Sequence, residues 1–441
     1  MILVGLNQCS IFNWVKQNVT GMIMRPTVSI LLGSGFSIPE ELPGVRQLNQ
    51  RLSKIDESEI LIHSDQRAIF LNEQEDLNRW SRWDERIFMQ EFLEFYNVEV
   101  LKDGETFHYE TFYDFYSGYL HNNENKEIIE KFYKAFNDKH FKGGDDNRDC
   151  YNRVSDFNRS FNQLLASQLH KTKYFEDVSY GNYPPYDPFI GFLRELLKTS
   201  DVKVHTLNHD LFFDFIGHHH GDLWQHFSDG YKLEGSPFYG TISYDFNQNT
   251  KLPVVTKTYH VKLEHFIDKF DTPLCLFKLH GSVFNTIVYT PEPDQKRIRL
   301  KDNYAVSQFV MEIKDPNTGE PCFRSLWDEV APDFLSGTTN KTRFYKGDPY
   351  YSNLFKHFEK NLSASELLVV IGYGFQDGGI NEYLEKFYLS SGKHMIVIDP
   401  YKPKTALIDK YNANYIAKGV TQVPYQEYLS LIPDKLKESK A

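Results

Sequence analysis

The chain has 441 residues, of which 49 are basic and 60 acidic, and its net charge at pH 7 is −11. A hydrophobic fraction of 41% with a charged fraction of 25% excludes a disordered chain. The acidic balance gives no overall attraction for nucleic-acid phosphate or anionic lipid, so only a local basic patch would supply it. A chain of this length has room for about two or three domains with large hydrophobic cores.

Cysteine usage and apolar stretches indicate the compartment. The four cysteines stand at positions 9, 150, 275 and 322, and no two have C-x-x-C spacing, which argues against a zinc ribbon. So few cysteines in a long chain favour a reducing compartment. Residues 1–7 lack a basic region before their apolar run, and no stretch approaches about 20 apolar residues. We therefore expect a cytoplasmic protein without a secretory signal or membrane contact.

Five apolar runs have the pattern of strands that are buried on both faces. They are residues 27–33 (TVSILLG), 202–208 (VKVHTLN), 274–281 (LCLFKLHG), 367–372 (LLVVIG) and 394–400 (HMIVIDP). Helical patterns follow three of them, at 45–55, 381–389 and 403–411. Strands that alternate with helices predict an α/β fold with a Rossmann-like, doubly wound parallel sheet.

The segment 57–198 has a different character. Charged and aromatic residues recur there at helical spacing, for example at 91–96 and 151–169, and residues 143–147 (GGDDN) predict a loop. We interpret 57–198 as a mainly helical insertion, 27–56 and 199–441 as the α/β domain, and 1–26 as an N-terminal extension. Residues 254–262 and 286–289 predict additional hairpin or edge strands.

A glycine-containing turn, Gly33-Ser34-Gly35-Phe36-Ser37, directly follows the first predicted strand. Glycines at such a turn allow the backbone to approach a diphosphate, and the following amides can point at it. The signal alone is weak, because many turns from strand to helix contain two glycines. Ile38 stands where a dinucleotide-binding fingerprint has its third glycine, and no clear acidic partner for ribose follows. An ordinary dehydrogenase is therefore disfavoured.

Polar or glycine residues also follow the other four predicted strands. These ends are 206–210 (TLNHD), 278–282 (KLHGS), 371–377 (IGYGFQD) and 398–400 (IDP). Each has an ordinary structural explanation, since Asn and Asp cap helices and most buried histidines are structural. Together, however, they would meet at the carboxyl edge of one sheet, which is where open α/β sheets bind ligands.

The motifs G-x-G-x-S, T-x-N-x-D, H-G, G-Y-x-F-x-D and V-I-D, in this order, resemble the sirtuin family. Residues 42–46 (LPGVR) stand where sirtuins have I-P-D-F-R, with Gly44 in place of the aspartate. The resemblance covers about residues 27–55 and 202–413. The cysteines cannot form the zinc module of deacetylating sirtuins. Residues 335–341 (LSGTTNK) and 371–381 (IGYGFQDGGIN) look like the bacterial sirtuin-like group that consumes NAD+ in antiphage defence.

The resemblance implies NAD+ as the substrate, with no further cofactor required. Asn208 and His280 match the sirtuin asparagine and catalytic histidine, and Asp210 matches the residue that contacts the nicotinamide amide. The resemblance assigns the remaining NAD-binding positions to Gly33, Ser34, Gly35 and Ser37 at the diphosphate, Gly372, Tyr373 and Asp399 near adenosine, Arg46 near the phosphates or the pocket lid, and Thr206 beside Asn208. We expect no metal, because adjacent histidines such as His218-His219-His220 diverge by about 100° on a helix.

The expected function is NAD+ glycohydrolysis, giving nicotinamide and linear or cyclic ADP-ribose, as an effector of bacterial antiviral defence. The alternatives are a non-catalytic module that binds NAD+ or ADP-ribose, an acyl-lysine deacylase or ADP-ribosyltransferase, and a nuclease or nucleic-acid sensor. The net charge and the lack of a basic stripe disfavour sequence-specific binding of nucleic acid. Related proteins act alone or with a HerA-like ATPase or another defence protein, and we expect a homo-oligomer bound to a partner.

Overall fold

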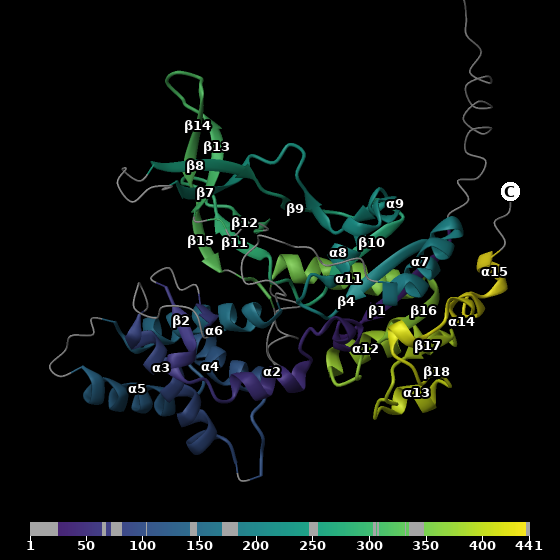
Figure 1. Cartoon of the computed structure of the whole chain (residues 1–441), viewed down its shortest axis with the longest axis horizontal. Helices are drawn as coiled ribbons and strands as arrows, with labels where there is room; N and C mark the ends of the chain where they lie inside the picture. The colour runs from purple at the N-terminus through teal and green to yellow at the C-terminus, as the bar shows by residue number, and fades with distance from the viewer. Residues whose placement is uncertain are drawn as a thin grey trace, which may run out of the picture.

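A seven-stranded parallel sheet forms the centre of the α/β part of the molecule (Figure 1). The computed structural model describes residues 25–63, 68–71, 82–102, 104–141, 148–169, 184–246, 255–302, 306, 308–330, 332–334 and 348–437. The strands have the spatial order β18-β17-β16-β1-β4-β10-β5, and every neighbouring pair is parallel. In chain order they are β1 (Thr27–Leu32), β4 (Asp201–Thr206), β5 (Phe227–Ser228), β10 (Leu274–Lys278), β16 (Ser365–Ile371), β17 (Met395–Ile398) and β18 (Asn414–Ile416).

The predicted fold class is confirmed, and all five predicted strands lie in this sheet. In β1 every residue except the first is buried, and in β10 every residue is buried, so apolar side chains fill both faces and the runs are continuous. The edge strands β5 and β18 were not predicted, because two and three residues carry too little pattern. The predictions at 143–147 and 335–341, and nearly all of 1–26, lie outside the described residues.

Helices cover both faces of the parallel sheet. Along β1, Val28, Ile30 and Leu32 contribute to one apolar cluster and Leu31 to the other, as the alternation of a strand requires. The first cluster includes side chains of α7 (Asp187–Thr199), α8 (Phe212–His219), α9 (Gly221–Trp224), α14 (Tyr425–Ser430) and α15 (Asp434–Lys437). The second includes α11 (Pro349–Ala364), α12 (Gly378–Phe387) and α13 (Ala406–Lys410). Within the described ranges, no helix combines the length and apolar character needed to cross a membrane.

The order of the strands reverses at β1. After β1 the chain adds β4, β5 and β10 on one side of it, with β5 at the edge. The chain then returns and places β16, β17 and β18 on the other side. A reversal of this kind leaves a crevice at the carboxyl ends of the two central strands, because the connections leave in opposite directions. The ends of β1 and β16 are therefore the expected centre of a binding site.

A helical lobe follows the first strand and lies to one side of the sheet (Figure 1). Its elements are α2 (Val45–Leu52), the short strands β2 (Ile60–Ile62) and β3 (Ala68–Phe70), α3 (Trp83–Phe95), a π-helical turn (Tyr96–Val100), α4 (Tyr109–Asn122), α5 (Lys126–His140) and α6 (Cys150–Leu169). Aromatic side chains such as Phe88, Phe92, Phe112 and Phe157 form its core. The boundary predicted at residue 198 falls inside α7, which packs under the parallel sheet instead.

Two antiparallel sheets project from the α/β part, beyond what the sequence predicted (Figure 1). The five-stranded sheet contains β6 (Gly230–Lys232), β9 (His265–Lys269), β11 (Asn285–Tyr289), β12 (Arg297–Lys301) and β15 (Trp327–Val330). The four-stranded sheet contains β7 (Phe238–Phe246), β8 (Val255–Lys262), β13 (Gln308–Lys314) and β14 (Pro321–Ser325). The strands predicted at 254–262 and 286–289 correspond to β8 and β11. β14 is mostly exposed, and the others mix buried, partly buried and exposed side chains, so their apolar signal is weak.

His205 makes the parallel sheet sensitive to acid. It lies on β4, fully buried between the rings of Phe277 and Phe358, at centroid distances of 4.9 and 4.7 Å. Burial, with a smaller contribution from the charge of Lys203, lowers the pKa of His205 from 6.5 to about 3. Below pH 6.5 the unfolded chain therefore binds a proton at His205, whereas the folded chain binds this proton only below about pH 3. Stability is lost across that window as the pH falls.

We expect His205→Phe to remove this dependence. The free energy of unfolding should increase at pH 7 by about 1–2 kcal/mol, because neither buried ring nitrogen has a hydrogen-bond partner among the described residues. At pH 5 the advantage of the variant should grow by a further ~2 kcal/mol. Urea denaturation of both proteins at the two pH values measures this difference. An equal loss of stability in both proteins between pH 7 and pH 5 would exclude His205 as the cause.

Candidate active site

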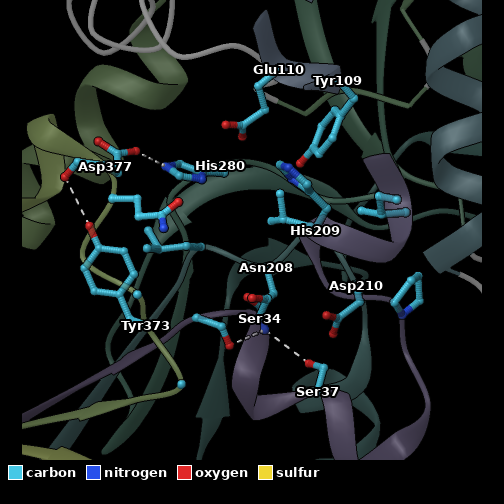
Figure 2. Close-up of a pocket in the computed structure, with 18 of the residues that line it drawn as sticks. Ser34, Ser37, Tyr109, Glu110, Asn208, His209, Asp210, His280, Tyr373 and Asp377 are labelled. Atoms are coloured by element: carbon cyan, nitrogen blue, oxygen red, sulfur yellow. Dashed lines mark hydrogen bonds and ion pairs between the residues drawn. The ribbon is translucent and has the colours of Figure 1, made fainter. Parts of the chain in front are cut away.

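A cavity of about 710 Å³ opens at the carboxyl edge of the parallel sheet, where the strand order reverses (Figure 2). This volume is in the range of small-molecule sites, which is about 300–1,000 Å³. Its walls come from the segments that follow β1, β4, β10 and β16, and from the helices α2, α4 and α12. The sequence-predicted residues that line it are Gly33, Ser34, Ser37, Asn208, Asp210, His280, Gly372 and Tyr373.

The turns after β1 and β16 pack against each other through their backbones. The amide of Gly33 donates to the carbonyl of Ile371 at 2.9 Å, and the amide of Gly35 donates to the carbonyl of Gly372 at 3.0 Å. A Cβ on Gly33 would lie 2.5 Å from the Gly372 oxygen, and one on Gly35 would lie 2.7 Å from the Gly372 Cα. These glycines therefore permit contact between the two turns.

In the glycine-containing turn after β1, most backbone amides are already bonded within the protein. The amides of Gly35, Phe36 and Ser37 all donate to carbonyls within the protein, and residues 34–36 form a short 3-10 helix. These amides are therefore engaged inside the structure, and Gly35 does not line the cavity. Ser34 and Ser37 do line it and bring hydroxyl groups to the wall.

Asn208 is held rigidly at the end of β4. Its Nδ2 donates to the carbonyl of Gly33 at 3.0 Å and to the hydroxyl of Ser37 at 3.1 Å. Its backbone amide donates to Oγ1 of Thr206 at 3.0 Å, so Thr206 supports Asn208 without lining the cavity. A carbonyl oxygen can only accept a hydrogen bond, so the Asn208 atom that contacts the Gly33 carbonyl must be the nitrogen Nδ2. The other side-chain atom, Oδ1, is therefore the hydrogen-bond acceptor of this amide.

Asp210 lies on the same segment and is buried. Its Oδ1 accepts the amide of Phe212 at 2.9 Å, and the Ser37 hydroxyl donates to its carboxylate. Burial raises its pKa above the usual value, although the nearby charge of Lys278 opposes the shift. The Lys278 ammonium donates to the backbone carbonyl of Asp210 at 2.6 Å and pairs with Asp214 at 2.8 Å. Asn208, Ser37 and Asp210 thus form one connected polar chain along the wall.

His280 follows β10 and is only 4% exposed. Its Nε2 lies 3.5 Å from Oδ2 of Asp377, which comes from the segment after β16 (Figure 2). The sequence predicted Asp377 only as a helix cap. The structure has that cap, since Oδ1 accepts the amide of Ile380 at 3.1 Å, and places the same carboxylate beside the histidine. A carboxylate next to an imidazole orients the ring and stabilises its protonated form.

Gly281 fixes the backbone that carries His280. Its φ is +80°, a conformation that side chains rarely adopt, and a Cβ there would lie 2.6 Å from the Asp333 carbonyl. The next amide, that of Ser282, donates to the same carbonyl at 3.3 Å. The position of His280 therefore depends on Asp333, whose carboxylate accepts a 2.6 Å hydrogen bond from the buried Arg299.

Three predicted positions other than Thr206 lie outside the lining. Gly35 packs behind it, and Arg46 is exposed on α2. Asp399 directly follows β17, its Oδ1 accepts the amide of Tyr401 at 2.8 Å, and burial raises its pKa. Tyr373 does line the cavity, and its hydroxyl donates to the carbonyl of Asp377 at 3.1 Å.

The helical lobe contributes residues that the sequence analysis did not identify. His108, Tyr109 and Glu110, at the start of α4, line the cavity together with Leu169 at the end of α6. No local signal marks them, because His108, Tyr109 and Glu110 lie about 70 residues beyond the nearest strand-end motif, which ends at Ser37. His209 also lines the cavity, and its ring centroid is 6.1 Å from that of His280.

The charged groups of the wall are almost all acidic. Among the described residues that line the cavity, four are carboxylates, three are histidines, and none is lysine or arginine. Within the described ranges, no group of three or more His, Cys, Asp and Glu residues is arranged to hold a metal ion. The wall thus offers a paired imidazole as a proton acceptor, a fixed amide, and a negative field that favours a cation.

The sheet and its crevice define a Rossmann-like α/β protein. The chain is similar over most of its length to solved sirtuin structures. A Sir2 homolog–NAD complex aligns with 92% of this chain and 89% of its own, at 10% identity and a TM-score of 0.34. A mutant Sir2 homologue with 2′-O-acetyl ADP ribose aligns with 99% of both chains, at 10% identity and a TM-score of 0.33. A Sir2–p53 peptide–NAD+ complex aligns with 94% and 95%, at 11% identity and a TM-score of 0.33. No protein-family model and no curated protein matches the chain.

Proposed function

We propose that this protein is an NAD+ glycohydrolase, which cleaves the bond between nicotinamide and ribose and releases nicotinamide and ADP-ribose. The observation that carries the proposal is the pairing of His280 with Asp377 at 3.5 Å in the cavity that Asn208 also lines. The cavity lies at the reversal of strand order, which is where open α/β sheets bind nucleotides.

The chemistry requires little beyond these groups. Nicotinamide in NAD+ is a pyridinium cation, so its nitrogen takes the bonding electron pair and leaves as a neutral molecule without an acid. The transition state at C1′ of the ribose is oxocarbenium-like, as in other glycoside cleavages. Water then forms the new C–O bond and loses a proton to His280, which passes it to solvent. Asp377 stabilises the imidazolium, and Oδ1 of Asn208 orients the water or a ribose hydroxyl.

The remaining wall residues suit the rest of the dinucleotide. In this proposal Gly33, Ser34 and Ser37 lie along the diphosphate, and Gly372 and Tyr373 lie towards adenosine. Gly35 and Thr206 hold the turns in place, since both lie behind the wall. Asp210, whose carboxylate can accept a hydrogen bond from an amide NH2 group, faces the carboxamide of nicotinamide. Arg46 remains proposed for the phosphates or the pocket lid and Asp399 for adenosine, although neither lines the cavity.

The alternative is a module that binds NAD+ or ADP-ribose without cleaving it. The His280–Asp377 pair favours catalysis, because binding alone has no use for a proton acceptor. On the resemblance of the sequence motifs, we also propose a cytoplasmic effector of bacterial antiviral defence that depletes NAD+. Such an effector would act as a homo-oligomer with a partner such as a HerA-like ATPase, and the helical segment 57–198 would be its added domain.

Chromatography of NAD+ after incubation with the purified chain tests the proposal. We expect nicotinamide and ADP-ribose from the unchanged protein, and a rate at least about 100-fold lower from Asn208→Ala. Circular dichroism checks that the variant is folded. Calorimetric binding of NAD+ without cleavage would support the non-catalytic module. Absence of both binding and cleavage would overturn the assignment of this cavity to NAD+.

A further inference from the structure

Of the four carboxylates of the cavity, Glu382 on α12 is exposed, and the other three have different surroundings. Asp377 pairs with His280 and caps α12, and Asp210 receives the Ser37 hydroxyl and lies near the Lys278 ammonium. Glu110 stands next to the buried Tyr109, whose hydroxyl donates to its carboxylate. The pKa of Tyr109 is raised well above its usual value by burial and by the negative charge of Glu110. Glu110 therefore brings its carboxylate to the cavity wall, beside the Tyr109 hydroxyl.

Glu110 is also firmly positioned. The amide of Tyr109 donates to Oδ1 of Asn49 on α2 at 2.9 Å, which fixes the start of α4. One turn further on, the ring of Phe112 is buried in the aromatic core of the helical lobe. In Figure 2, Glu110 and Tyr109 lie on the side of the cavity where the rings of His209 and His280 are drawn, and Ser34 and Ser37 lie beyond Asn208. The carboxylate therefore lies at the end of the cavity where the glycosidic bond would be cleaved.

The helical lobe and the two reactive segments form one packed unit. Leu211, three residues after Asn208, and Val283, three residues after His280, are both buried in the aromatic core of the lobe. Burial raises the pKa of Tyr113 on α4, and the nearby carboxylate of Asp333, the residue that holds the backbone beside His280, adds to the shift. The start of α4 thus has a fixed relation to both reactive residues.

We propose that Glu110 of the helical lobe is a substrate-contacting carboxylate, which faces the cationic nicotinamide riboside end of NAD+ in this cavity. The inference rests on the proposed function and adds a residue to it. A carboxylate near the pyridinium attracts the cation during binding, and near C1′ it stabilises the positive charge of the transition state. The lobe is thereby part of the active site, and any partner that displaces α4 lowers the activity.

The test compares two ligands that differ at this end. Binding is measured by calorimetry in the His280→Ala background, so that NAD+ is not consumed, with NAD+ and with ADP-ribose, which lacks the pyridinium. We expect Glu110→Gln to weaken NAD+ binding about tenfold or more, and to leave ADP-ribose binding unchanged or tighter. Glu127→Gln is the matched control, because Glu127 is the second residue of α5, as Glu110 is of α4, and is exposed.

The outcomes separate this inference from the proposed function. Equal binding of NAD+ by Glu110→Gln and by the control, or an equal loss for NAD+ and ADP-ribose, overturns the role of Glu110. If the protein with an intact His280 still cleaves NAD+ in that case, the proposed function stands without Glu110. If the background binds neither ligand and the intact protein cleaves no NAD+, the proposed function and the inference both fail.

Discussion

His280→Ala is expected to lower the rate of nicotinamide release by about 10²–10⁴-fold, the usual contribution of a positioned general base. The KM for NAD+ should change little, because the proton is transferred only in the transition state. Folding should survive, since the neighbouring backbone is held independently by Gly281 and the Asp333 carbonyl. Initial rates of nicotinamide formation, measured by chromatography over a range of NAD+ concentrations, give both parameters.

A second histidine–carboxylate pair supplies the control. Nε2 of His357 on α11 lies 3.0 Å from Oδ1 of Asp268, and neither residue lines the cavity. His357→Ala therefore removes a similar pair, and NAD+ cleavage should continue at the unchanged rate. If the two variants retained equal activity, His280 would have no part in the reaction. If both lost activity together with their near-ultraviolet circular dichroism, the loss would be one of folding.

The sequence predicted the parallel sheet and most of one wall of the cavity, for a physical reason. A strand buried on both faces produces a continuous apolar run, and the polar residue that follows it must lie at the carboxyl edge. Asn208 and His280 were found in this way. The antiparallel strands other than β8 and β11 escaped prediction because many of their side chains are exposed or only partly buried. For example, of the residues of β14 only Cys322 is partly buried.

Contacts between distant segments could not be predicted from local patterns. Asp377 follows β16, and His280 follows β10, with β1 and β4 between these two strands. The sequence around Asp377 indicates a helix cap, which is correct, but it contains no signal for a histidine across the sheet. Glu110 stands at the start of a helix in the lobe, and long-range packing, such as that of Leu211 and Val283 into the lobe, brings it to the cavity. The glycines were predicted for ligand approach, and Gly33 and Gly372 line the cavity; local patterns did not show that these glycines and Gly35 also permit contact between the two turns.

That contact between turns leads to the expectation that Gly372→Ala destabilises the chain by at least about 3 kcal/mol. Gly372 has a φ of +63°, which disfavours any residue with a Cβ, and this conformation alone costs about 1 kcal/mol. The larger effect is steric, because the new Cβ would lie 2.5 Å from Cα and C of Gly35 and from N of Phe36. These are backbone atoms, which cannot rotate away as a flexible side chain would.

Gly392→Ala isolates the steric part of this effect. Gly392 has a φ of +73°, and no atom lies within 4 Å of the position its Cβ would take, so only the conformational cost of about 1 kcal/mol applies there. Chemical denaturation of the two variants and the unchanged protein measures the difference. Equal stability of the two variants would mean that the turns can separate at little cost. A large loss confined to Gly372→Ala, accompanied by loss of NAD+ binding, would establish that the contact between β1 and β16 shapes the cavity.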